Sequence, residues 1–135
     1  MTQVLALIER LREALQEAPS YTEEALAAKV RTPAASLEFR QALRVLDDRM
    51  EILVDAATRT VRGRRRLTAH VLESLTGGPR TQAELRAATG AWTAAIADVV
   101  GWLVKEGRVD ISADAGGVER VRLKRGQSGA QPTTA

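Results

Sequence analysis

Residues 81–123 read TQAELRAATGAWTAAIADVVGWLVKEGRVDISADAGGVERVRL, and residues 22–62 read TEEALAAKVRTPAASLEFRQALRVLDDRMEILVDAATRTVR. Each stretch opens with a threonine, continues through two segments of helical periodicity, and ends in two short segments separated by a turn. The chain therefore contains an internal repeat, which constrains the fold before any single residue does. A feature present in both copies indicates architecture, and a feature present in one copy is a candidate for function.

The apolar positions of the two copies match at a spacing of roughly 60 residues. They are Leu7, Leu11, Leu15, Phe39, Leu43, Leu46 and Ile52 in the first copy, and Leu67, Val71, Leu75, Ile96, Val100, Leu103 and Val109 in the second. The repeat predicts two domains, residues 1–64 and 65–125, followed by a disordered polar tail at 126–135. Units of this size bury a thin core, so we expect the copies to pack on each other or on a second chain.

The local signals predict the same order of elements in each copy. Helices are expected at 4–17, 22–29 and 34–49, with Ser20 and Glu23 as a capping box, followed by a hairpin over 51–62. The second copy predicts helices at 67–76, 81–88 and 91–105, with Thr81 and Glu84 as a capping box, and a hairpin over 108–124. The predicted class is mainly α with small β-hairpins, that is, α+β.

Three helices followed by a β-hairpin, with a tight turn between the second and third helices, resemble the winged-helix variant of the helix-turn-helix. The resemblance covers residues 3–125 as two tandem winged-helix domains and rests on element order and apolar spacing. In that family the third helix usually enters the DNA major groove, and the hairpin wing lies along the backbone. The resemblance implies double-stranded DNA as the partner.

The outward faces of the two third helices differ. The first copy presents Leu37, Arg40, Gln41 and Arg44, with Ser36 nearby and Arg31 in the preceding turn. Arginines bind phosphates, and polar side chains read base edges, so we predict DNA contacts from Arg31, Ser36, Arg40, Gln41 and Arg44. The alternative is a solvated face with local ion pairs, such as Arg44 with Asp48.

The second copy presents Ala94, Ala97, Asp98 and Gly101 at the equivalent positions, with Trp102 on the flank. A stripe of small residues allows a second helix to approach closely. We therefore predict a protein interface at Ala94, Ala97, Gly101 and Trp102, serving a homodimer or another protein partner. The alternative is that the stripe reflects only the alanine-rich composition.

Basic residues also cluster in and after the hairpins. Phosphate contacts are predicted for Arg62, Arg64, Arg65 and Arg66 between the copies and for Arg120, Arg122 and Lys124 on the last strand. Alternation along that strand sends Val121 and Leu123 inward and the basic residues outward. The alternative is a charged edge that prevents strand-to-strand aggregation.

Several kinds of chemistry lack the residues they need. The chain has no cysteine and a single histidine, His70, so we expect no metal site, no catalytic residues and no cofactor. No apolar run approaches the roughly 20 residues that span a bilayer, so no membrane partner is expected. The sequence predicts a non-enzymatic, cytoplasmic, nucleoid-associated DNA-binding protein, most simply a transcriptional regulator. The alternative is a protein-interaction adaptor, as tandem winged helices form in condensin subunits that bind kleisins.

Overall fold

The computed structural model describes residues 2–124, and the predicted disordered tail at 126–135 lies outside them. The described residues form six helices and two small antiparallel sheets, which confirms the predicted α+β class. The chain divides into two compact units between Leu67 and Thr68. The order of elements is compatible with a winged-helix-like fold, and the assignment of two tandem winged-helix domains stays a prediction.

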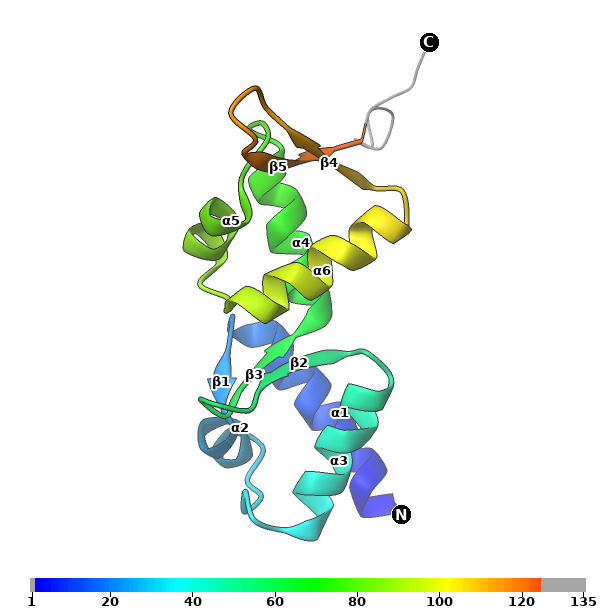
Figure 1. Ribbon diagram of the computed structural model, residues 1–135. Helices are drawn as coiled ribbons and strands as arrows, with labels where there is room; N and C mark the ends of the chain where they lie inside the picture. Colours follow the sequence, from blue (N-terminus) through cyan, green and yellow to red (C-terminus); the bar gives the residue numbers. More distant parts are fainter. Residues whose placement is uncertain (1, 125–135) are drawn as a thin grey trace. The chain divides into compact units, whose positions relative to one another are not determined.

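The first unit consists of three helices and a three-stranded sheet (Figure 1). Its helices are α1 (Thr2–Glu17), α2 (Glu23–Lys29) and α3 (Leu37–Asp48), and its strands are β1 (Tyr21–Thr22), β2 (Ile52–Asp55) and β3 (Thr60–Gly63). The strand order is β1-β3-β2, so β3 is the central strand and both neighbours are antiparallel to it. The sequence did not predict β1, which pairs Tyr21 with Val61.

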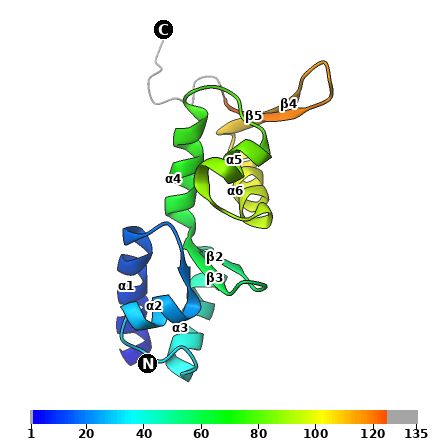
Figure 2. The same ribbon diagram turned by 90° about the vertical axis from the view of Figure 1, so that its left-hand side faces the viewer.

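The second unit repeats this order with a longer hairpin. Its elements are α4 (Arg64–Leu75), which begins in the last residues of the first unit, α5 (Gln82–Thr89), α6 (Thr93–Lys105), β4 (Val109–Ala113) and β5 (Glu119–Leu123). Arg80 forms an isolated bridge with Val121, at the position where Tyr21 of β1 pairs with Val61 in the first unit. The β4–β5 hairpin extends away from α5 and α6 (Figure 2).

Side-chain caps start the short helices at defined residues. Thr81 Oγ1 accepts from the Glu84 amide, and the Glu84 carboxylate accepts from the Thr81 amide, which confirms the predicted capping box. In the first unit the prediction of Ser20 as cap is wrong, because Thr22 lies directly before α2 and its Oγ1 accepts from the Ala25 amide. The cap satisfies a backbone amide that has no partner inside the helix.

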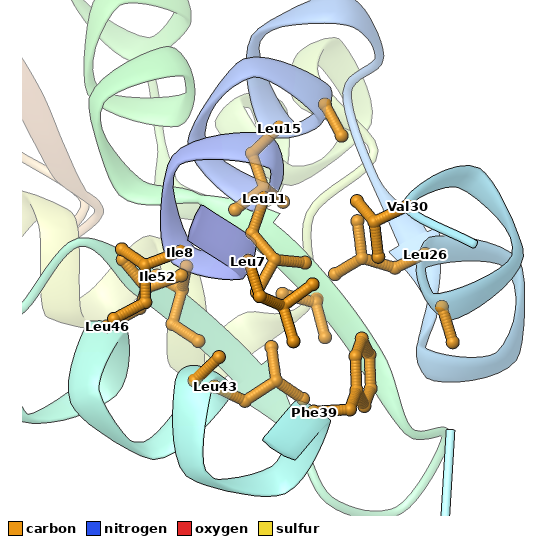
Figure 3. Packing of buried hydrophobic residues seen from close by; sticks show 14 residues of the cluster. Leu7, Ile8, Leu11, Leu15, Leu26, Val30, Phe39, Leu43, Leu46 and Ile52 are labelled. Atoms are coloured by element: carbon orange, nitrogen blue, oxygen red, sulfur yellow. The ribbon is translucent and has the colours of Figure 1, made fainter. Parts of the chain in front are cut away.

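The cores contain the residues that the repeat matched. In the first unit Leu7 and Leu11 of α1, Leu26 of α2 and Phe39 of α3 belong to one buried cluster, which fills the space between the three helices (Figure 3). In the second unit Val71, Leu75, Ile96, Val100, Leu103 and Val109 are all buried. The inward faces predicted from the repeat are therefore confirmed.

Gly63 ends β3 where the strand passes close to α1. A β-carbon at this position would lie 3.2 Å from the carbonyl oxygen of Leu15 and 3.3 Å from its β-carbon. We expect Gly63→Ala to lower the free energy of unfolding by about 1–3 kcal/mol, because a buried backbone must move to accept the methyl group. Urea unfolding checks this, with Gly101→Ala as the control, because a β-carbon at Gly101 of α6 would meet nothing within 4 Å. Unchanged stability in Gly63→Ala would contradict the close approach.

Within residues 2–124 no single helix is long and apolar enough to cross a bilayer. Only α5 and α6 taken together reach that length and composition, and they are bent by 113° at the break between them.

Candidate nucleic-acid interface

The outward face of α3 is exposed, as the sequence predicted. Gln41 and Arg44 lie on this face and are exposed to solvent, and Leu37 beside them is 69% exposed. Within the described part of the chain Arg44 has no ion-pair partner, so the pair with Asp48 named in the alternative interpretation does not form. This guanidinium is available to an anionic partner.

Arg40 is exposed on the flank of the same face, but it already has an internal partner. Its Nη1 donates to Oε1 of Glu23 at 2.7 Å, and Nη2 of Arg59 donates to the same oxygen at 3.3 Å. Glu23 is the first residue of α2, and Arg59 lies in the turn between β2 and β3. Three elements of the first unit therefore meet at one carboxylate.

Ser36 and Arg31, two further predicted DNA contacts, interact with or lie beside other residues of the first unit. Ser36 is the N-cap of α3, and its Oγ accepts from the Phe39 amide at 3.2 Å. Arg31 is exposed and adopts a left-handed φ of 58° after α2. It lines an open depression together with Arg10, Glu13, Glu17 and Lys29, so its surroundings carry mixed charge. The structure thus gives Ser36 a capping role that was not predicted from the sequence.

The arginine run between the copies is not an exposed linker, and for two residues this corrects the prediction. Arg62 and Arg64 are buried, because β3 extends to Gly63 and α4 begins at the next residue. Burial, with a smaller contribution from the charge of Arg66, lowers the pKa of Arg62. Both guanidiniums lie inside the fold and cannot bind a phosphate backbone on the surface.

The remaining two arginines of the run are exposed. Nη1 of Arg66 donates to the carbonyl oxygen of Gln16 in the last turn of α1, which satisfies a carbonyl without a helical partner. Arg65 has no ion-pair partner within residues 2–124. Of the four predicted contacts, Arg65 and Arg66 are exposed, and Arg65 is the one that makes no ion pair or side-chain hydrogen bond within residues 2–124.

The β4–β5 hairpin carries its basic residues on one face, next to acids. Arg120 lies 3.6 Å from carboxylate oxygens of both Glu84 and Asp114. Arg122 stands opposite Asp110 in the register of the two strands, and both Arg122 and Lys124 are exposed. A hydrogen bond from the Val118 amide, aided by Gly116 and Arg120, lowers the pKa of Asp114. The outward direction of the basic residues is confirmed, but Arg120 has acidic partners within its own unit.

The outward face of α6 is exposed and carries small residues. Ala94, Ala97 and Gly101 are exposed, Trp102 is half-buried, and a β-carbon built at Gly101 would meet nothing within 4 Å. The exposed face of α3 is therefore basic, and the equivalent face of α6 is small and uncharged at these positions. The protein interface at these positions stays a prediction.

Among residues 2–124, histidines and carboxylates do not gather in any group of three that could hold a metal ion.

The predicted site omitted two residues of the first unit that lie next to its exposed arginines, Glu23 and Arg59. Glu23 was interpreted only as part of a helix cap. Its burial next to Arg40 and Arg59 depends on the packing of α2, α3 and the hairpin, which the local pattern does not reveal.

Comparison with known proteins gives a likeness of fold. No protein-family model matches the sequence, and no curated protein matches it. The mRNA-binding domain of elongation factor SelB from E. coli, solved in complex with SECIS RNA, is 13% identical with a TM-score of 0.50. That likeness covers 90% of this chain and 97% of that domain. The DIP2311 protein from Corynebacterium diphtheriae is 17% identical with a TM-score of 0.40, over 87% of this chain and 26% of that one.

Proposed function

We propose that the chain is a non-enzymatic protein that binds double-stranded DNA through its first unit. The observation that carries the proposal is the exposed face of α3, where Arg40, Gln41 and Arg44 follow one another over a single helical turn. Such a face offers guanidinium groups to phosphates and an amide to base edges. The repeat supports a functional role for the basic residues of α3, because α6 shares the buried face but has no basic residue at the equivalent positions.

The second unit is proposed to contribute less to DNA binding. Arg122 and Lys124 are its exposed basic residues on the hairpin, and they supply sequence-independent contacts to the backbone. Arg65 at the start of α4 adds another exposed cation. Regulation of transcription, in the cytoplasm and on the nucleoid, is the proposed cellular role.

The SelB domain supports nucleic acid as the class of partner and makes RNA the main competitor of DNA. The decisive experiment measures the affinity for duplex DNA, duplex RNA and single-stranded RNA at several salt concentrations. The wild type and the double variant Arg40→Ala/Arg44→Ala are compared. Duplex DNA is expected to bind most tightly, because an A-form major groove is too deep and narrow for side chains to read. A dissociation constant in the millimolar range at low salt, or tighter binding of RNA, refutes the proposal.

Arg44 allows the sharpest single test. We expect Arg44→Ala to weaken duplex DNA binding about tenfold and to reduce the salt dependence by about one phosphate contact. Arg86→Ala is the matched control, because Arg86 is an exposed arginine on α5 that donates to Thr93 within the second unit. Equal losses in both variants would show a general effect of net charge and no specific contact from α3.

An adaptor role is the second candidate, and it concerns the second unit. Val104 is exposed on α6 near the small residues Ala97 and Gly101, which gives this face an apolar edge. Light scattering after size exclusion tests the homodimer. A monomer at tens of micromolar would remove the homodimer role proposed for this face.

A further inference from the structure

The carboxylate of Glu23 lies beneath two exposed arginines of the first unit. Its side chain is only 9% exposed, whereas those of Arg40 and Arg59 are 48% and 64% exposed. The acid therefore faces the protein, and the two guanidiniums face the solvent above it. A single carboxylate leaves the three-residue cluster with a net positive charge.

The backbone fixes Arg59 in this position. Its carbonyl oxygen accepts a hydrogen bond of 2.8 Å from the Glu23 amide, and the next residue, Thr60, pairs with Thr22 in the sheet. Arg59 also has a φ of 54°, in the left-handed region that arginine rarely occupies. Non-glycine residues in this region persist where the surrounding structure determines them, and they gather at binding sites.

The second unit lacks the cluster although it repeats the fold. Gln82 stands where α2 has Glu23, directly after the capping threonine, and Ala97 stands where α3 has Arg40. The shared architecture therefore does not need the acid or the arginine. Both residues occur in the unit whose third helix is basic, which indicates that they serve the exposed surface of that helix.

We propose that Arg40 and Arg59 form a phosphodiester-binding pair, and that Glu23 is a positioning residue that holds the two guanidiniums side by side. This proposal rests on the proposed function and adds Arg59 and Glu23 to it. Each guanidinium has five N–H donors and donates one of them to Glu23 in the structure. The remaining donors bind phosphate oxygens, and the internal ion pairs reduce the rotamer freedom that binding would otherwise remove.

The direction of the change in DNA affinity caused by Glu23→Gln distinguishes a positioning role from an effect of net charge. Removing an acid beside a DNA-binding surface should strengthen binding if only net charge matters. If Glu23 positions the arginines, Glu23→Gln weakens binding to a short fluorescent DNA duplex at low salt, by about three- to tenfold. Glu24→Gln is the matched control, since Glu24 is the next residue of α2, is exposed and carries the same charge.

Arg59→Gly tests the pair in a second way that preserves the fold. Glycine accepts the left-handed φ without strain, so the variant removes the guanidinium and keeps the turn. We expect about a tenfold loss of affinity, and little further loss when Glu23→Gln is added, because the two residues act as one unit. Thermal unfolding followed by circular dichroism confirms that each variant is folded.

The outcomes distinguish this inference from the proposed function. If the wild type binds duplex DNA and Arg44→Ala weakens it, but Glu23→Gln binds as tightly as Glu24→Gln, the positioning role is refuted. An unchanged affinity in Arg59→Gly refutes the pair. If the wild type does not bind duplex DNA at low salt, the proposed function itself fails, whatever the variants show.

Discussion

Phe39→Ala should lower the free energy of unfolding by about 3–5 kcal/mol, the largest stability effect we expect from any single substitution in this chain. The ring is fully buried and lies where α1, α2 and α3 converge (Figure 3). Its removal loses the transfer free energy of a large aromatic side chain and leaves a cavity that the neighbouring leucines cannot fill completely. Because total stability is commonly about 5–15 kcal/mol, urea unfolding should show a large fall in the midpoint.

Leu37→Ala is the control for this effect, because Leu37 lies in the same helix and is 69% exposed. We expect a change within about 0.5 kcal/mol, as for most surface substitutions. The pair of variants separates burial from helix propensity, since both replace an apolar residue of α3 by alanine. Equal destabilisation by the two variants would contradict the role of the buried Phe39 ring in the core.

The fold could be predicted from the sequence because buried residues recur at the helical spacing, and the repeat shows this spacing twice. Leu43 and Leu46 are buried one turn apart on α3, and Val100 and Leu103 repeat them on α6. Such a pattern is local, so it can be recognised in the sequence without knowledge of tertiary contacts. The two-residue strand β1 was not predictable in this way, because Tyr21 and Thr22 become a strand only by pairing with Val61 and Thr60.

The arginine run shows the limit of composition as a guide. Four arginines in five residues were predicted to lie on a phosphate-binding linker, yet β3 and α4 follow each other at Gly63 and Arg64 without any linker. The strand directs Arg62 into the fold, where desolvation lowers its pKa, and Arg66 donates to the carbonyl of Gln16. Charge density alone did not reveal which guanidiniums would remain outside.

The candidate site was predictable where exposure follows from helical phase and not where it depends on a distant partner. Gln41 and Arg44 are exposed because Phe39 and Leu43 on the same helix are buried. Arg40 and Arg59 both donate to Glu23, from positions 17 and 36 residues away in the sequence. The sequence carries no local signal for such a meeting, so the Glu23 cluster emerged only from the packing of α2, α3 and the hairpin.

Arg44→Glu should weaken duplex DNA binding about 100-fold at low salt, the largest functional effect we expect. The substitution removes a charge-assisted phosphate contact and places a carboxylate in the phosphate field, which together amount to roughly 3 kcal/mol. Arg44 is exposed and has no ion-pair partner among residues 2–124, so the fold should persist. Fluorescence anisotropy with a labelled duplex measures the loss, which should shrink as salt is added.

The double variant Ala97→Glu/Gly101→Glu changes the net charge by the same amount on the equivalent face of α6. Both positions are exposed, and a side chain at Gly101 meets open space, so the second unit should accept the change. If one unit contacts the DNA and the other supports it, this variant loses only a few-fold in affinity, as long-range repulsion predicts. A loss equal to that of Arg44→Glu would show that α6 also faces the duplex, and the divergence between the two copies would then need another explanation.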